Sequence, residues 1–226
     1  MIVNADFSKR AAVHAAQLPW TPSPIAGVER RMLDRVGDEV ARATSIVRYA
    51  AQSSFSSHTH GGGEEFLVLD GVFQDEHGNY PAGFYVRNPP GSSHTPRSET
   101  GCVIFVKLWQ FEPSDRKQVV LDTGKLPFQL SPGRLGVSSA LLFRDEHEEV
   151  RLESWLPNTQ ITLEFPAGGE VLVLDGSFEE GEQRFEHLSW LRLPAGDSLR
   201  AAAGPSGCKV WMKSVSHGAV CSEGGS

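Results

Sequence analysis

The sequence contains one long internal repeat, and this repeat constrains the fold more than any other feature. Residues 65–71 read Glu-Phe-Leu-Val-Leu-Asp-Gly, and residues 170–176, which lie 105 positions later, read Glu-Val-Leu-Val-Leu-Asp-Gly. Further matches follow in the same order, at the same offset or one position beyond it: Pro89 and Gly91 as Pro194 and Gly196, and Gly101 and Cys102 as Gly207 and Cys208. We therefore predict two copies of one folding unit, joined within 112–134 and divided into domains 1–115 and 116–226.

Both copies consist of short segments rich in Val, Ile, Phe and Tyr. Residues 45–49, 65–69 and 102–106 are examples, with Gly, Pro, Asp or Asn between them. Such segments at nearly regular spacing predict antiparallel strands in a sandwich or barrel. No long stretch has the apolar period of a helix, and only residues 8–16 suggest a short helix or turn. The expected fold is all-β, with two tandem barrels.

Composition and charge exclude several classes of protein. The chain has 226 residues, of which 39% are hydrophobic, and its formal net charge is −7 without any basic cluster. We therefore expect no nucleic-acid partner. No apolar run approaches the roughly 20 residues of a membrane-spanning helix, and the first residues do not resemble a secretion signal. The spacing of Cys102, Cys208 and Cys221 matches no zinc or redox motif, so we expect a cytoplasmic protein whose thiols are buried or idle.

A histidine-rich segment of the first copy carries the chemistry. Residues 58–65 read His-Thr-His-Gly-Gly-Gly-Glu-Glu, and residues 89–94 read Pro-Pro-Gly-Ser-Ser-His. Alternate residues of a strand point to one face, so His58 and His60 can project together. His94 follows a Pro-Gly corner that would present it from another strand. Three imidazoles and one carboxylate form a suitable donor set for Zn(II), Fe(II), Ni(II) or Mn(II).

The repeat indicates which acidic residue completes this set. Glu65 recurs as Glu170, whereas the positions 105 residues beyond the other candidates are occupied by Leu163, Phe165, Gly169 and Leu199. A carboxylate that persists where the histidines are lost serves structure, and one that disappears with them is the better ligand. The predicted metal ligands are therefore His58, His60, Glu64 and His94. The second copy is predicted to have an apolar interior and no metal.

The two segments resemble the two cupin motifs, G-x5-H-x-H-x3-E-x6-G and G-x5-P-x-G-x2-H-x3-N. The matching residues are His58, His60, Glu64 and Gly71 in the first motif and Gly83, Pro89, Gly91 and His94 in the second. Gln52 stands at the opening Gly and Ser98 at the closing Asn, and neither position holds a ligand. The resemblance implies that each copy is a cupin barrel, also called a double-stranded β-helix, so that the chain is a bicupin.

Over about residues 18–111 the chain is similar to the ChrR-type cupins, on stretches such as 41–45, 63–71, 75–83 and 87–94. This resemblance implies a zinc-binding sensor or regulator in the response to singlet oxygen or other oxidants, connected to an ECF sigma factor. In that family a separate N-terminal helical zinc domain with a His-x3-Cys-x2-Cys signature holds the sigma factor. The first cysteine of this chain is Cys102, so the sigma factor is a partner by resemblance only.

Two other functions remain open at this point. Other cupins that resemble this site are Fe(II) or Ni(II) dioxygenases, isomerases or decarboxylases, and a metal-stabilised binding module is a third alternative. The lining of the site discriminates between them, because an enzyme needs a substrate-sized pocket with convergent polar groups. We assign no catalytic residue, and we expect a small-molecule ligand and a homodimer, since cupin barrels often associate.

Overall fold

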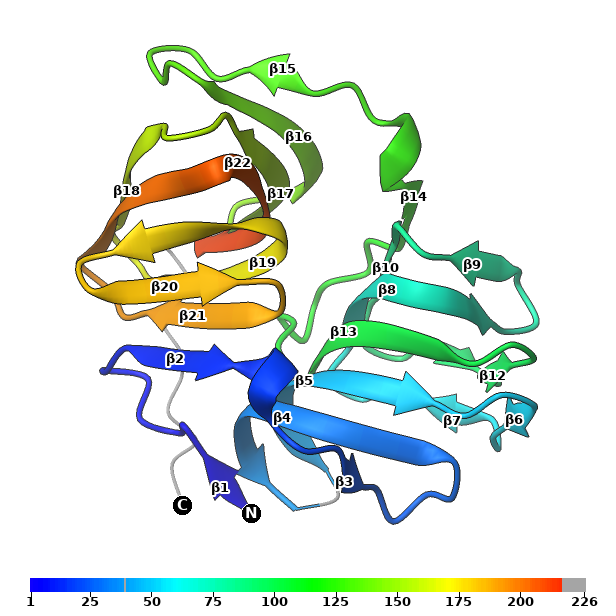
Figure 1. Cartoon of the computed structure of the whole chain (residues 1–226). Helices are drawn as coiled ribbons and strands as arrows, with labels where there is room; N and C mark the ends of the chain where they lie inside the picture. Colours follow the sequence, from blue (N-terminus) through cyan, green and yellow to red (C-terminus); the bar gives the residue numbers. More distant parts are fainter. Residues whose placement is uncertain (39, 217–226) are drawn as a thin grey trace. The chain divides into compact units, whose positions relative to one another are not determined.

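The computed structural model describes residues 1–38 and 40–216, and nearly all regular structure in them is β (Figure 1). The predicted all-β fold is confirmed. The strands belong to two compact units. Unit 1 comprises Met1–Ala5 and Leu18–Leu126, and unit 2 comprises Asp6–Gln17 and the chain from Pro127 onward. The described residues contain no helix with the length and apolar character that crossing a bilayer requires.

Unit 1 is built on a twisted antiparallel sheet whose strands follow the order β1-β4-β5-β13-β8-β10-β14. The short strands β7 and β11 pair with each other in a separate ribbon. Its core lies between these strands and contains Val47, Phe66, Val68, Phe73 and Ile104. The elements of unit 1 are β1 (Ile2–Val3), β3 (Thr21–Pro22), β4 (Val28–Gly37), β5 (Ala41–Tyr49), β6 (Ser53–Ser54), β7 (His58–Thr59), β8 (Glu64–Gln74), β9 (Asn79–Pro81), β10 (Phe84–Asn88), β11 (Ser93–His94), β12 (Arg97–Ser98), β13 (Cys102–Leu108), β14 (Val119–Asp122) and the 3-10 turn η2 (Thr123–Lys125).

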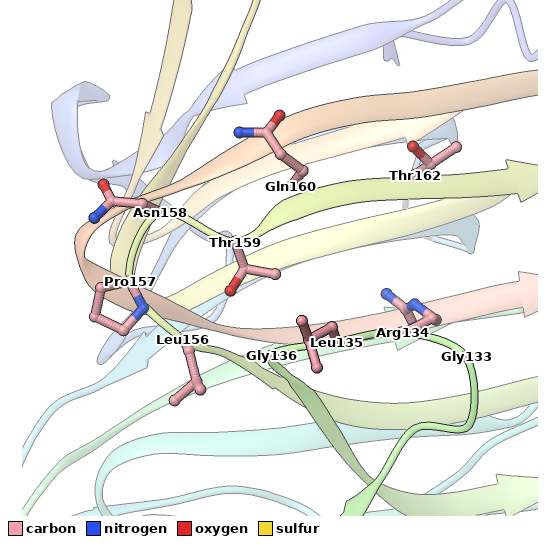
Figure 2. Close-up of a pocket in the computed structure, with 10 residues that line it drawn as sticks. All are labelled: Gly133, Arg134, Leu135, Gly136, Leu156, Pro157, Asn158, Thr159, Gln160 and Thr162. Atoms are coloured by element: carbon pink, nitrogen blue, oxygen red, sulfur yellow. The ribbon is translucent and has the colours of Figure 1, made fainter.

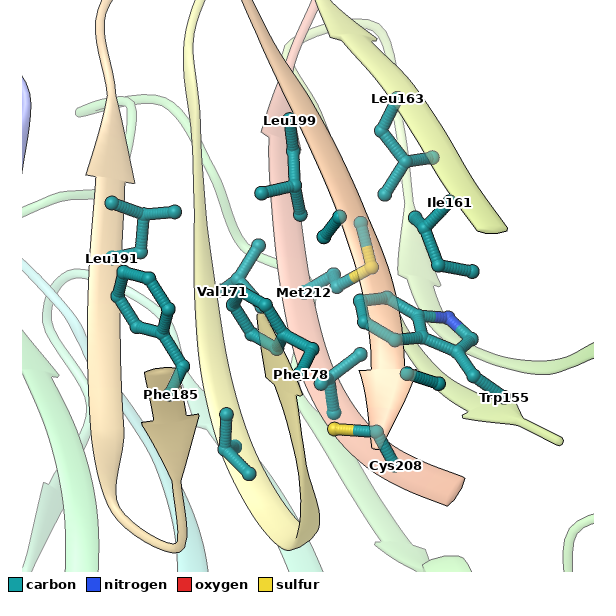
Figure 3. Packing of buried hydrophobic residues seen from close by; sticks show 14 of the residues in the cluster. Trp155, Ile161, Leu163, Val171, Phe178, Phe185, Leu191, Leu199, Cys208 and Met212 are labelled. Carbon is teal, nitrogen blue, oxygen red and sulfur yellow. The ribbon is translucent and has the colours of Figure 1, made fainter. Parts of the chain in front are cut away.

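Unit 2 has the corresponding antiparallel order β15-β16-β17-β22-β19-β21-β2. Its interior is filled by aromatic and aliphatic side chains, among them Trp155, Phe178 and Phe185 (Figure 3). The rings of Phe178 and Phe185 stack with their centroids 4.6 Å apart. The elements of unit 2 are β2 (Ala11–His14), the 3-10 turn η1 (Ala15–Gln17), β15 (Gln129–Leu130), β16 (Val137–Arg144), β17 (Glu148–Trp155), β18 (Gln160–Phe165), β19 (Gly169–Glu180), β20 (Gln183–Glu186), β21 (Ser189–Leu193) and β22 (Asp197–Val215).

The repeat appears in the structure as equal strand register. His58 pairs with His94 between β7 and β11, and Leu163 pairs with Leu199 between β18 and β22. The same backbone constraint requires the glycine of the repeated Asp-Gly pair in both units. Gly71 and Gly176 both have φ of +70°, and a Cβ there would lie 2.1 and 2.2 Å from the carbonyl oxygens of Gly101 and Gly207, so only glycine fits.

Unit 2 includes one strand from near the N-terminus, so most of unit 1 lies in the sequence between that strand and the rest of unit 2. β2, near the N-terminus, pairs with β21 of unit 2, so that Ala11 lies opposite Arg192. β14 pairs with β10 of unit 1, so that Val119 lies opposite Arg87. The contacts therefore divide the chain differently from the predicted boundary between 115 and 116.

The segment 8–16, for which the sequence suggests a short helix or turn, forms strand β2 followed by the 3-10 turn η1. Its alanines favour a helix in isolation. Pairing with the edge of β21 and burial of Ala11 and Ala15 outweigh that preference.

The buried thiols act as small apolar side chains. Cys102 and Cys208 are free and buried, and burial raises the pKa of their thiols to about 11 and about 12. This confirms the prediction for these two cysteines. Cys221 lies outside the described residues.

Candidate metal centre

The pairing of β7 with β11 brings the predicted histidines together. Strand pairing sets His58 opposite His94. The backbone of His60, one residue beyond β7, donates to Ser92 O at 2.9 Å and accepts from Gly91 N at 2.9 Å. The glycine turn that follows lies under Trp109, because a Cβ on Gly62 would be 2.4 Å from the indole ring. The chain then enters β8 at Glu64, beside the histidines.

The three predicted histidine ligands cluster, and Glu64 lies beside two of them. One ring nitrogen each from His58, His60 and His94 lies within 4.8 Å of the other two, and His60 Nε2 is 3.1 Å from His94 Nε2. Glu64 Oε2 lies 3.4 Å from His60 Nε2 and 3.6 Å from His94 Nε2. Donors about 2.0–2.2 Å from one ion lie roughly 3–3.6 Å from one another in a tetrahedral site. The donor chemistry of all four residues, and the spacing of His60, His94 and Glu64, therefore fit a divalent metal ion.

Burial and charge prepare this cluster for a cation. His60, Glu64 and His94 are buried, whereas His58 is exposed at the edge of the site. Burial lowers the pKa of His60, which favours the neutral ring that metals bind. Burial also opposes a charge on His94, but the hydrogen bond that its ring donates to Asp75 and the charge of Glu64 raise its pKa overall. A metal ion bound at His94 would displace the proton that Asp75 and Glu64 favour on its ring.

A further set of polar side chains orients the candidate ligands. Asp75 Oδ2 lies 3.3 Å from His94 Nδ1, while its Oδ1 accepts from the backbone of His77 and from the Tyr80 hydroxyl. Asn88 Nδ2 donates to Glu64 Oε2 at 3.2 Å. Such contacts fix ring and carboxylate orientation. Sequence reasoning missed Asp75 and Asn88, because the sequence 75–79 indicates only a turn and nothing in it shows that His94 faces that turn.

Glu64 and Glu65 point to opposite faces of β8. Glu65 Oε1 accepts from the Tyr85 hydroxyl at 2.9 Å, and in unit 2 Glu170 Oε2 accepts from Trp190 Nε1 at 3.0 Å. The carboxylate repeated in both units therefore joins neighbouring strands, as the repeat indicates. Only Glu64 faces the histidines.

A cavity of about 670 Å³ opens beside this cluster, and His58 and Glu64 form part of its wall. Most of the remaining lining is apolar and includes Val47, Leu108 and Trp109. This volume is within the range of small-molecule sites. The centre is therefore accessible to a ligand and is not closed by packed side chains.

Unit 2 replaces the same four positions with apolar groups. Leu163, Phe165 and Leu199 are buried in its core, and Figure 3 shows Leu163 and Leu199 directed into that core. A Cβ on Gly169 would lie 2.2 Å from Phe165 Cδ1, so the Phe165 ring fills the space that corresponds to the Glu64 side chain. These positions offer no metal-binding side chain.

A second hollow, of about 660 Å³, lies on unit 2 (Figure 2). None of the four corresponding positions is among the residues that line it. Leu135, Leu156 and Thr159 line it, together with Arg134. Two hydrogen bonds, of 2.5 and 2.9 Å, tie Arg134 to the buried carboxylate of Glu153. The hollow therefore has an arginine whose charge is already balanced.

Comparison with known proteins agrees with this geometry. Residues 8–112 match the family model described as the ChrR cupin-like domain. No curated protein sequence matches the chain. A Nostoc punctiforme protein provisionally described as a dioxygenase is 16% identical, with 94% of this chain and 81% of that chain covered and a TM-score of 0.71.

Two further solved structures have the same fold. A Cupin 2 conserved barrel domain protein from Leptotrichia buccalis is 12% identical, with 90% of this chain and 95% of that chain covered and a TM-score of 0.61. The bacterial pirin YhhW of Escherichia coli, solved in complex with nickel(II), is 15% identical, with 92% and 100% covered and a TM-score of 0.65. At these identities the similarity establishes the cupin fold over most of the chain.

Proposed function

We propose that unit 1 binds one divalent metal ion and a small molecule beside it. The premise is that residues 8–112 match the ChrR cupin-like domain, within a chain of two cupin barrels. The ligands are His58, His60, Glu64 and His94. The observation that supports the proposal is the cluster of three histidine nitrogens, with the Glu64 carboxylate beside His60 and His94.

The cavity favours action on a small molecule over a purely structural metal site. Four protein ligands leave one or two positions on a five- or six-coordinate ion, and His58 and Glu64 lie in the cavity wall. A divalent ion bound there supplies Lewis-acid or redox chemistry to a molecule in the cavity. The apolar lining excludes bulk water from that molecule, and Asp75 and Asn88 hold His94 and Glu64 in position. A metal-dependent dioxygenase or a related small-molecule enzyme is the activity this arrangement supports best.

A second function, an oxidant sensor or regulator, is supported by the match to the ChrR cupin-like domain. In this proposal the same site reports on oxidants through the metal or its ligand, and an ECF sigma factor is the candidate partner. Zinc is the expected ion on family resemblance, and iron, nickel and manganese suit the same donors. We propose the reducing cytoplasm as the compartment and a homodimer as the oligomeric state.

The experiment that tests the proposal is metal analysis of protein purified without added metal. It is followed by anaerobic reconstitution with Fe(II), Ni(II) or Zn(II), and by oxygen uptake on a panel of diketones and phenols. We expect about one ion per chain, lost in His94→Ala and retained in His77→Ala. His77 is the matched control because it is an exposed histidine in the neighbouring turn.

The outcome separates the two functions. Substrate-dependent oxygen uptake that His94→Ala abolishes would establish an enzyme. Tightly held zinc without oxygen uptake would favour the sensor. Protein that binds no metal under any of these conditions would refute the proposal.

A further inference from the structure

The cavity beside the metal centre contains an arginine without a partner. Arg30 lies on β4 opposite Val47 of β5, and both residues line the cavity together with Val28. The Nε atom of Arg30 is buried and has no hydrogen-bond partner. No ion pair within residues 1–38 and 40–216 includes Arg30. Its guanidinium therefore faces the cavity with its charge unbalanced.

Strand geometry explains why Arg30 and not its neighbour reaches this cavity. Val28 and Arg30 share one face of β4 because they are two residues apart. Arg31 points to the other face, where its guanidinium lies 4.2 Å from the centre of the Trp20 ring. The two adjacent arginines thus differ in what they contact, although they are alike in sequence.

Other arginines in comparable positions have acidic or carbonyl partners. Arg134, in the hollow of unit 2, is bound to Glu153. Arg87 is bound to Asp115 at 2.7 Å. Arg35, the second arginine of the unit 1 cavity, donates to Asp38 O. A partly buried guanidinium without a partner costs free energy. Arg31 also lacks an acidic partner, but its guanidinium lies against the Trp20 ring. Arg30 is the one that lines the cavity without such a contact, and it points to an anion that comes from outside the chain.

The rest of the lining specifies what kind of anion this is. Glu64 is the one acidic residue in the described lining, and its Oε2 is directed at the histidines and Asn88. It therefore belongs to the metal-binding cluster and leaves Arg30 unbalanced. Ile25, Leu108 and Trp109 supply apolar surface around Arg30. The cavity thus combines two arginines, of which Arg30 has no hydrogen-bond partner for its Nε, with apolar walls and a site for a cation.

We propose that Arg30 binds the carboxylate of the small molecule, so that the ligand is an organic acid with an apolar body. The planar guanidinium fork matches a carboxylate with two parallel hydrogen bonds. This inference deepens the proposed function, on which it rests for its chemical role, by naming the class of molecule that lies beside the metal. Inorganic phosphate lacks an apolar body that could contact the apolar walls of the cavity.

The test measures binding to metal-loaded protein by isothermal calorimetry and by intrinsic tryptophan fluorescence, since Trp109 is one of the five tryptophans and lines the cavity. The probes are 3-phenylpropanoate and hexanoate, their two amides, and inorganic phosphate. We expect the acids to bind about tenfold or more tightly than the amides. Arg30→Gln should weaken acid binding by about tenfold or more and remove the difference between acid and amide. Arg30→Lys should retain part of that difference.

Arg31→Gln is the matched control, because it removes the same charge from the opposite face of the same strand. Unchanged acid binding in Arg31→Gln, with unchanged thermal unfolding and metal content in Arg30→Gln, would support the inference. Equal binding of acid and amide, equal losses in both variants, or tighter binding of phosphate than of the acids would overturn it. Protein that binds acids through Arg30 but holds no metal would refute the proposed function alone. Metal-bound protein that does not bind the acids would refute this inference alone.

Discussion

The two units have the same strand register and opposite interiors. His58 and His94 face each other in unit 1 where Leu163 and Leu199 face each other in unit 2. These residues pair in the same way in both units, so the barrel does not require the proposed metal ligands in order to form. The histidines and Glu64 are therefore additions to a fold that packs equally well around leucine and phenylalanine. What the two units share explains the fold, and what they do not share explains the chemistry.

The largest expected effect concerns the apolar side of this comparison. Phe165→Ala should lower the free energy of unfolding by about 3–5 kcal/mol, because it empties the space that the ring fills beside Gly169. Chemical denaturation followed by tryptophan fluorescence measures this, and metal content should not change. The corresponding change in unit 1, His60→Ala, should have the opposite result: it should remove the metal and lower stability less than Phe165→Ala does. A loss of metal in Phe165→Ala would break the comparison.

A second prediction contrasts two neighbouring carboxylates. Glu64→Gln should weaken metal binding by more than about 100-fold, because it removes the charge of a proposed ligand. Replacing a residue that only orients a ligand weakens metal binding by about 10–100-fold. Glu65→Gln should leave metal binding unchanged and lower stability, because Glu65 accepts a hydrogen bond from Tyr85 on the other face of β8. Competition with a metal-binding dye gives both affinities. Equal affinities in the two variants would show that Glu64 is not a ligand.

A smaller effect is expected at Asp75, which orients His94. Asp75→Asn should weaken metal binding by roughly 10–100-fold, because the amide holds the ring of His94 less firmly than a carboxylate. The same dye competition measures it, with Glu76→Gln as the control on the adjacent exposed residue. An effect as large as that of Glu64→Gln would indicate that Asp75 itself binds the ion.

The smallest effect is expected for Glu153 of unit 2, the carboxylate paired with Arg134, and it depends on pH. Burial opposes the charge of Glu153, but Arg134 and Arg151 more than compensate and lower the pKa of its carboxyl. A lowered folded-state pKa adds stability above the unfolded value of about 4.3, and this stability is lost as the pH falls through the folded value.

Glu153→Gln should therefore destabilise the protein by roughly 1–2 kcal/mol at pH 7. The difference from the wild type should shrink between about pH 5 and pH 3. Urea denaturation at several pH values measures it. A difference that is constant with pH would show that the Glu153 charge does not contribute.

The sequence predicts the repeat, the barrels and the approach of the three histidines, because the repeat and the two histidine motifs are visible as patterns of residues. It does not predict Arg30, whose inward direction depends on the register of β4, a strand with an irregularity between Met32 and Asp34. It does not predict Asp75 either, since contact with His94 joins two separate loops. These residues depend on long-range pairing, which a single sequence does not display.

The place of β2 in unit 2 has a consequence for synthesis on the ribosome. Ala11 is made early but pairs with Arg192, which follows 181 residues later. At about 5–20 residues per second, β2 waits roughly 10–35 s for its partner. Unit 1 can close once β14 has emerged, so the candidate metal site is complete while β2 is still unpaired. A change that disrupts β2 would therefore damage the unit that is translated last.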